Sequence, residues 1–260
     1  KIREGMTFPS GNPVTAEDVA WSLRRVLELN LASASQFTEW GWSSQTAKDD
    51  FIALDERTLQ IRTTKPYVRN LIFGVFALHA TSTLDRKLLL ENEIDGDLGN
   101  TWLTTHSACV GPYRLQTWLA NQTVILKANE NHWGDAPEMQ RIIIRHVPEA
   151  GAQRLLLERG DIDVARTMNA SDAAELDATD GFEVTSEPLH AYYYIGLNAM
   201  DEAFQAPRVR LAYRYLVDYE ALQNSIMTYS GMTRQSVVPV GAFGALPANE
   251  APFQLDLDVA

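Results

Sequence analysis

Short strand-like and helix-like segments alternate along nearly the whole chain, and this alternation constrains the fold more than any other feature of the sequence. Apolar residues recur at helical spacing from Val19 to Leu27. Leu59, Ile61 and Thr63 instead alternate with polar residues, as in a half-buried strand. Such a mixture predicts a mixed α/β or α+β architecture in which helices and sheets share a core.

Turn residues and capping residues divide the chain into these segments. Thr15, followed three residues later by Asp18, predicts a capping box at the start of the first long helix. Gly160 predicts a positive φ just after a helix. We expect strands at residues 2–8, 51–54, 59–63, 113–118, 122–127, 141–147, 162–164, 182–186 and 191–197. We expect helices at residues 16–30, 68–75, 84–91 and 148–159, after Ser171, and from Pro207 onwards.

Composition and charge exclude several classes of protein. With 45% apolar residues, the chain of 260 residues is typical of one large or two ordinary globular domains. Its 34 acidic and 22 basic residues give a net charge of −12, which disfavours binding to nucleic acid or to an anionic membrane surface. The longest mainly apolar stretch, residues 71–80, is far shorter than the ~20 residues of a membrane span.

Metal sites and disulfides are not predicted. Cys109 is the only cysteine, so an intramolecular disulfide and a cysteine cluster are excluded. His106 and Cys109 form one His-x-x-Cys pair, but a structural zinc site needs a second pair. The acidic loop 95–100 resembles a calcium loop only superficially, because Asn100 stands where glycine is needed. We therefore predict neither a metal nor another cofactor.

Catalytic motifs are absent as well. The sequence contains no Gly-x-Ser-x-Gly elbow, no phosphate-binding Walker loop and no Gly-x-Gly-x-x-Gly fingerprint after a strand. Cys109 alone is more typical of a small buried hydrophobic residue than of a nucleophile. We predict no catalytic residue and no enzyme.

Aromatic residues are the remaining candidates for ligand binding. Tyr192 and Tyr194 share one face of the expected strand 191–197, and Asn198 follows its end. Such a wall would stack on a ligand and hydrogen-bond to it. The alternative for these aromatic residues is core packing. The candidate ligand-binding residues are Phe37, Trp40, Trp42, Tyr192, Tyr194 and Asn198.

Several blocks, in the same order, resemble a known family. They are residues 2–8 with 11–19, Gly111-Pro112-Tyr113, residues 126–134, residues 157–163 and residues 193–218. Together they closely resemble family 5 extracellular solute-binding proteins, the dipeptide, oligopeptide and nickel receptors of bacterial ABC importers. Most of these blocks concern the scaffold, so they identify the fold better than the ligand.

The resemblance implies a periplasmic-binding-protein-like fold of type II, similar to cluster C, with two lobes that close by a hinge. It also implies a monomer that captures di- or oligopeptides between the lobes and delivers them to the ABC permease and ATPase in the membrane, with no nucleic-acid partner. A sensor or regulatory domain of the same fold, or a binder of nickel chelates or sugars, is the alternative. The implied location is periplasmic, or extracellular and membrane-associated.

The family's greater length further implies a fragment that is incomplete at both ends, with the signal peptide outside this chain. The expected parts are a small subdomain of the first lobe at 1–105, the main part of that lobe at 106–198, and the start of the second lobe at 199–260. On this expectation the isolated chain lacks high-affinity binding, because the charge partners for peptide termini come largely from the second lobe in this family.

Overall fold

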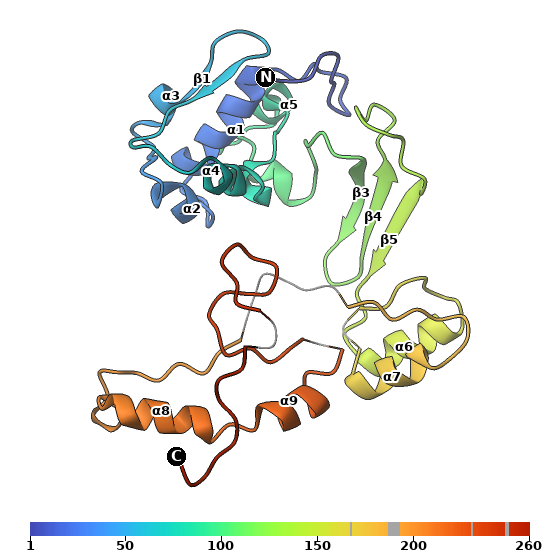
Figure 1. Cartoon of the computed structure of the whole chain (residues 1–260). Helices are drawn as coiled ribbons and strands as arrows, with labels where there is room; N and C mark the ends of the chain where they lie inside the picture. Colours follow the sequence, from blue (N-terminus) through green and yellow to red (C-terminus); the bar gives the residue numbers. More distant parts are fainter. Residues whose placement is uncertain (167, 187–192, 230, 248–249) are drawn as a thin grey trace. The chain divides into compact units, whose positions relative to one another are not determined.

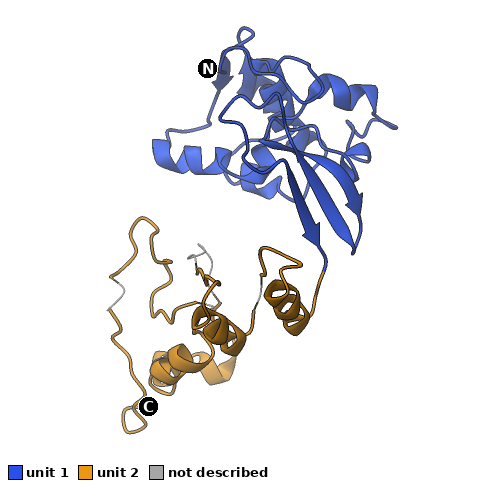
Figure 2. Ribbon diagram, turned by 90° about the vertical axis from the view of Figure 1, so that its right-hand side faces the viewer, with its two compact units in different colours: residues 1–146 blue, residues 147–260 orange. Residues whose placement is uncertain are grey.

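A computed structural model describes residues 1–166, 168–186, 193–229, 231–247 and 250–260. The chain divides into two compact units, residues 1–146 and residues 147–260, which are called unit 1 and unit 2 below (Figure 2). Helices and strands both occur in unit 1, which agrees with the predicted mixed architecture. The three parts expected from the family resemblance remain a prediction.

The longest helix, α1 (Ala16–Glu28), organises unit 1 (Figure 1). Its predicted capping box is confirmed: the Thr15 backbone N–H donates to Asp18 Oδ2 at 2.8 Å, and the Asp18 backbone N–H donates to Thr15 Oγ1 at 3.3 Å. One face of the helix, which includes Leu23 and Val26, is buried in the core. Burial of that face, at about 25 cal/mol per Å² of apolar surface, stabilises the helix in place.

A β-hairpin and two short helices complete this core. Strands β1 (Phe51–Ala53) and β2 (Leu59–Ile61) lie within the two strand ranges that the sequence predicted, and they pair antiparallel with Phe51 opposite Ile61. The short helices α2 (Ser35–Thr38) and α3 (Ala47–Asp50) lead into the hairpin. Helix α1 contacts β1, β2 and α3, so the hairpin packs on the apolar face of this helix.

The segment after the hairpin is helical and irregular. Helix α4 spans Arg69–Phe76, α5 spans Arg86–Glu91, and the 3₁₀ turns η1 and η2 span His79–Thr81 and Trp102–Thr104. Asp85, 1% exposed, caps α5 by accepting the Leu88 backbone N–H at 3.0 Å. The same carboxylate accepts hydrogen bonds from Ser10 and Asn12, which fixes the early turn against α5.

Three antiparallel strands form the second sheet of unit 1, in the order β3, β4, β5. They span Tyr113–Leu119, Thr123–Ala128 and Arg141–Arg145, close to the predicted ranges, and lie side by side in Figure 1. Asn129, 3% exposed, donates to Gly111 O at 2.9 Å through its side chain and to Pro112 O at 2.8 Å through its backbone. These bonds hold the entry of β3 against the end of β4.

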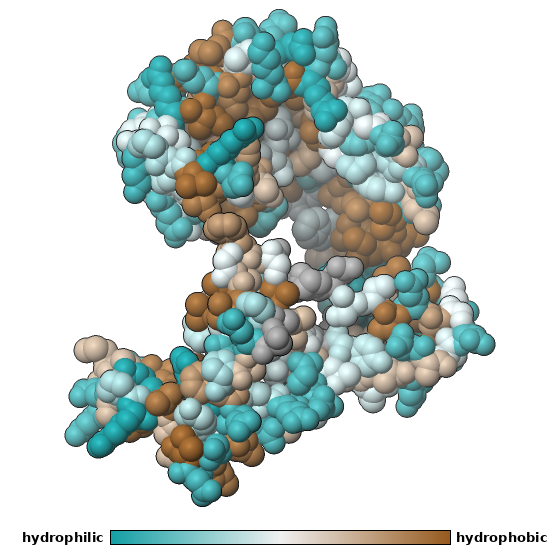
Figure 3. Space-filling model, in the orientation of Figure 1, coloured by the Kyte–Doolittle hydropathy of each residue, from teal (hydrophilic) through white to brown (hydrophobic). Residues whose placement is uncertain are grey.

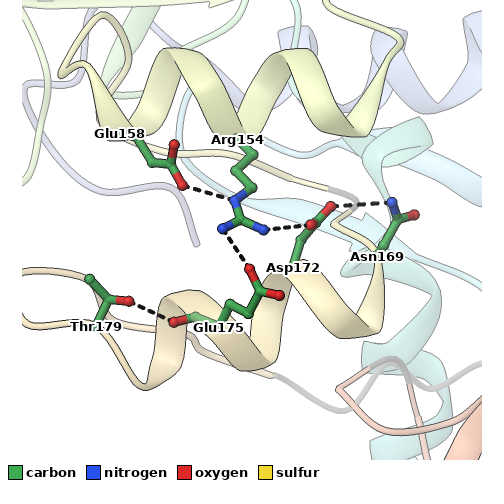
Figure 4. A network of polar contacts seen from close by, with 6 residues as sticks. All are labelled: Arg154, Glu158, Asn169, Asp172, Glu175 and Thr179. Atoms are coloured by element: carbon green, nitrogen blue, oxygen red, sulfur yellow. Dashed lines mark hydrogen bonds and ion pairs between the residues drawn. The ribbon is translucent and has the colours of Figure 1, made fainter.

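Unit 2 consists of short helices joined by extended segments. Helices α6 (Ala150–Glu158) and α7 (Ala170–Asp177) are joined by Arg154, whose guanidinium pairs with Glu158, Asp172 and Glu175 at 2.8, 2.7 and 2.7 Å (Figure 4). Gly160 has φ +73°, as predicted for the residue after α6. The other elements in the described residues of unit 2 are the 3₁₀ turn η3 (Glu202–Phe204), α8 (Pro207–Tyr215) and α9 (Tyr219–Ser225).

Four of the expected strands are not found in the described residues. Residues 2–8 contribute only an isolated bridge between Thr7 and Pro13, and residues 162–164, 182–186 and 193–197 are not strands. The remainder of the expected strand 191–197 lies outside the described residues. Alternating side chains supply a pattern, but a strand also needs a partner for its backbone groups, and these segments have no such ladder among the described residues.

Candidate functional site

Phe37 and Trp42 lie in the core of unit 1. They are 0% and 1% exposed, and the Trp42 ring contacts Phe37 at 6.1 Å and Phe51 at 5.2 Å between ring centroids. Trp42 also donates its indole N–H to Arg62 O at 2.7 Å, so its polar atom is satisfied inside the protein. Burial of this kind leaves no side-chain surface for a ligand, so these two residues follow the core-packing alternative rather than the expected ligand contact.

Trp40, by contrast, is only half-buried and lies at the surface. Its ring meets the ring of Tyr67 edge to face at 4.9 Å, and the Tyr67 hydroxyl donates to Trp40 O at 3.0 Å. The Lys65 ammonium lies 5.3 Å from the centre of the Tyr67 ring. These contacts hold the indole in one orientation, as a residue that stacks on a ligand must be held.

Trp40 lines an open hollow of about 250 Å³, which we call the Trp40 hollow. Its lining is Gln36, Glu39, Trp40, Leu71, Gly74, Val75 and Leu78. Gln36 Oε1 is buried and has no hydrogen-bond partner among the described residues, whereas Glu39 is exposed. The hollow therefore combines an apolar lining with the exposed carboxylate of Glu39.

Residues of α4 in this hollow were missed by the sequence reasoning. Leu71, Gly74, Val75 and Leu78 follow the i, i+3, i+4, i+7 spacing of one helix face, which continues past the end of α4. The helical spacing of these four residues can be recognised in the sequence, and Gly74 interrupts an otherwise apolar face. The sequence does not show that this face lies beside Trp40, because that depends on how the elements pack in three dimensions.

A second hollow, of about 280 Å³, lies elsewhere on unit 1. Its aromatic residue, Trp133, is already covered by the Arg3 guanidinium at 4.4 Å from the ring centre, a cation–π contact. The lining residues are Lys1, Ile2, Arg3, Met6, Val14, Val19, Thr83, Val110 and Trp133. Because its ring is occupied by a side chain of the protein, this hollow is the weaker candidate.

The remaining candidates belong to unit 2. Tyr194 is 77% exposed, and Asn198 is exposed with its Oδ1 accepting the Met200 backbone N–H at 3.0 Å. Asn198 therefore starts a turn rather than ending a strand. Tyr192 lies outside the described residues, so its predicted sharing of a face with Tyr194 remains a prediction.

The described residues give little support for a metal site or for a nucleophilic cysteine. No group of three or more His, Cys, Asp or Glu side chains in the described ranges is arranged to hold a metal ion. Burial raises the pKa of the Cys109 thiol, which lowers the fraction of reactive thiolate at neutral pH. Among the helices in the described part of the chain, none is both long and apolar enough to span a bilayer.

Comparisons with known proteins agree with one another. A sequence model of the bacterial extracellular solute-binding proteins, family 5 (middle), matches residues 1–260. The chain is 27% identical over 243 residues to "Probable D,D-dipeptide-binding periplasmic protein DdpA" of Escherichia coli K12, covering 94% of the chain and 45% of that protein. It is 25% identical over 240 residues to the glutathione-binding protein GsiB of Escherichia coli O1:K1, covering 92% and 44%.

A solved structure supports the same fold. The murein tripeptide binding protein MppA of Escherichia coli superposes with a TM-score of 0.74 at 21% identity, covering 94% of the chain and 49% of that structure. The chain thus spans about half the length of the proteins it matches. At this level of identity the superposition shows the fold and not the ligand.

Proposed function

Because the chain belongs to the bacterial extracellular solute-binding proteins of family 5, we propose that its full-length gene product is the substrate-binding component of an ABC importer. It captures di- and oligopeptides and delivers them to a permease in the membrane. The predicted family and the periplasmic-binding-protein fold are both confirmed. The observation that carries the proposal is the family match across all 260 residues.

Peptides are the proposed ligands because two relatives carry peptide ligands in their names, a D,D-dipeptide and glutathione. Family 5 solute-binding proteins are transport receptors and not enzymes. We extend this to the present chain and propose that it has no catalytic activity of its own. The proposed location is periplasmic or extracellular, where the family's receptors work, and the proposed working form is a monomer.

Ligand contacts are proposed on each unit separately. On unit 1 the contact is Trp40, whose ring is oriented by Tyr67 and borders a hollow. On unit 2 the contacts are Tyr194 and Asn198, both exposed, together with Tyr192. Aromatic rings beside amide groups suit a peptide, which offers apolar side chains and backbone hydrogen-bonding groups at regular spacing.

A thermal-shift panel on the full-length gene product tests the function. Ligand at one hundred times its dissociation constant stabilises a protein by about 2.7 kcal/mol. We therefore expect dipeptides or tripeptides to raise the melting temperature by several degrees, and nickel chelates and sugars to leave it unchanged. A rise with a nickel chelate or a sugar alone would overturn the peptide assignment, and no rise with any class would overturn the receptor role.

Gene context separates transport from signalling. Permease and ATPase genes beside this gene support import. A DNA-binding or kinase module fused to the same reading frame would instead identify a sensor built on this fold, and would contradict delivery to a permease.

A further inference from the structure

The sequence contains two Asp-Gly pairs, Asp95-Gly96 and Asp180-Gly181. Aspartate followed by glycine is especially prone to a rearrangement of the backbone, because glycine has no side chain to shield its nitrogen and few conformational limits. All four residues are exposed, and a Cβ placed on either glycine would meet no atom within 4 Å. Steric access therefore does not distinguish the two pairs.

The rearrangement needs no cofactor and no partner. The backbone nitrogen of the glycine attacks the side-chain Cγ of the aspartate, a C–N bond forms, and the proton of the nitrogen leaves with the carboxyl hydroxyl as water. Water then opens the resulting cyclic imide at either carbonyl carbon. Attack at Cγ restores aspartate, whereas attack at the backbone carbonyl carbon breaks its bond to nitrogen and leaves isoaspartate, whose chain runs through Cβ. One water is released and one is taken up, and no electron is transferred.

The Asp95-Gly96 pair lies in a turn that its neighbours hold closed. Asp95 has φ +51° and Gly96 has φ +79°, and the Asp97 backbone N–H donates to Ile94 O across them at 3.0 Å. The Asp97 carboxylate also accepts three backbone N–H groups of the same loop, that of Ile94 among them, at 2.7–3.0 Å. Rotation of the Asp95 backbone toward the imide geometry would separate Asp97 from Ile94 and break the bonds between them.

The Asp180-Gly181 pair lies in a turn with far fewer ties. This turn follows α7, and one backbone hydrogen bond spans it, from Phe182 N–H to Thr179 O at 3.3 Å. The Asp180 carboxylate forms no hydrogen bond or ion pair within the described ranges. Residues 183–186 are not part of a strand, so no ladder holds the chain beyond the turn. Rotation of the Asp180 backbone therefore breaks one long, exposed hydrogen bond.

We propose that Asp180 converts spontaneously to isoaspartate in the folded protein, whereas Asp95 is protected by the bonds of Asp97. A closed turn must open before the glycine nitrogen can reach Cγ, and opening costs free energy. Hydrogen bonds to a carboxylate are stronger than those between neutral groups, so the Asp97 loop opens far less often than the turn after α7. The product keeps its mass but has one more backbone atom in that turn. This inference does not depend on the proposed receptor function.

Ageing the full-length gene product in warm, mildly acidic buffer, followed by peptide mapping, tests the proposal. Isoaspartate gives a second chromatographic peak of unchanged mass, and it resists a protease that cuts before aspartate. We expect this peak for the Asp180 peptide, with conversion at least about tenfold slower at Asp95. The same protein aged in urea measures the intrinsic reactivity of the two pairs, and there the two rates should be similar.

Two variants make the test specific. Asp180→Glu keeps a carboxylate but would need a larger ring, so the second peak should disappear from this peptide. Asp97→Ala removes the acceptor that ties the loop, so it should speed conversion at Asp95 by about tenfold or more and leave the rate at Asp180 unchanged. The proposal is overturned by equal rates at the two pairs in the folded protein, or by the absence of conversion at Asp180 there, whatever occurs in urea.

Discussion

Asp85 is the residue on which the packing of the early turn depends. Its carboxylate accepts Ser10 Oγ at 2.5 Å, Asn12 Nδ2 at 2.9 Å and the Leu88 backbone N–H at 3.0 Å. The side chain is 1% exposed, so water does not replace these bonds when one is lost. One carboxylate thereby caps α5 and holds a turn that lies more than seventy residues earlier in the chain.

We predict that Asp85→Ala lowers the free energy of unfolding by about 1–3 kcal/mol, because it removes a helix cap and the buried acceptor of the hydrogen bonds from Ser10 and Asn12. Urea unfolding measures this loss. The control is Asp55→Ala, which removes a carboxylate that accepts two backbone N–H groups in an exposed turn. The control should lose less, and an equal loss for the two variants would refute the role given to Asp85.

Asp97 organises a loop of left-handed residues next to α1. Hydrogen bonds from Thr101, Ile94 and Gly99 hold the pKa of its carboxyl well below the ordinary value of 3.8. The loop is tied to the helix by Arg25, whose Nε donates to Leu98 O at 2.9 Å. The ionised form of Asp97 is therefore the form that the fold stabilises.

The depressed pKa predicts the direction of a pH effect. Because the unfolded chain binds a proton more readily at Asp97 than the folded one, its contribution to stability is present above about pH 5 and is lost progressively as the pH falls below 4. Asp97→Asn should give a flatter loss of stability with acid than the parent protein. Urea unfolding at stepped pH measures it, with the exposed Asp49→Asn as control, and an unchanged slope would contradict the prediction.

Local residue chemistry was predictable where the partners are close in sequence. The Thr15–Asp18 capping box and the positive φ of Gly160 depend on neighbours a few residues away, and both were expected correctly. The role of Asp85 depends on partners that the fold brings together from distant parts of the sequence. No spacing in the sequence marks this residue, so it was not identified in advance.

Helices were predicted from the sequence more reliably than strands, because a helix depends on local residues and a strand depends on a partner. A helix satisfies its own backbone, so periodicity was enough to place α1, α4 and α6 near their observed ranges. A strand needs a partner, and alternation was a reliable guide only where a hairpin supplies that partner next in sequence, as for β1–β2 and β3–β4. The expected strands at residues 162–164 and 182–186 have no partner nearby in the sequence.

Ion pairs join α6 to α7. Arg154 from α6 meets Asp172 and Glu175 of α7 as well as Glu158 of its own helix (Figure 4). The hydrogen bonds that the guanidinium donates to Glu158, Asp172 and Glu175 raise the pKa of Arg154 further above its ordinary value, so it stays charged throughout the working range of pH. Partly exposed pairs are screened by salt, which makes this helix pair sensitive to ionic strength.

We predict that Arg154→Met speeds amide hydrogen exchange in both α6 and α7, because the ion pairs that join the helices are lost. Exchange measured by NMR or mass spectrometry reports each helix separately. The control Arg159→Met removes an exposed arginine at the end of α6 that forms none of the ion pairs seen in the described residues. Equal exchange in the two variants would contradict the role of Arg154, as would insensitivity of the parent's exchange to added salt.

Apolar burial is distributed unevenly over the chain. Unit 1 contains the clusters around α1 and α5, with side chains such as Phe37, Trp42 and Leu89 at 0–1% exposure. Among the described residues of unit 2, only Ala173 and Leu176 are buried hydrophobics. Hydrophobic side chains are visible at the surface of this unit in Figure 3, and Ile226 is 67% exposed.

We therefore predict that the 260-residue chain does not unfold as one cooperative unit. Slow hydrogen exchange should concentrate in unit 1, above all in α1, and α8 and α9 should exchange early, because few buried contacts oppose their opening. Urea transitions followed by the tryptophans of unit 1 and by exchange in unit 2 should not coincide. A single transition shared by both units would contradict this division.

Receptor function is tested most directly by isothermal titration calorimetry of the full-length gene product with dipeptides and tripeptides. We predict one-to-one binding at micromolar or tighter dissociation constants for at least one peptide, with a negative heat-capacity change from the apolar surface that the ligand buries. A folded full-length protein that gives no binding heat with any peptide would contradict the assignment of this chain to a peptide receptor.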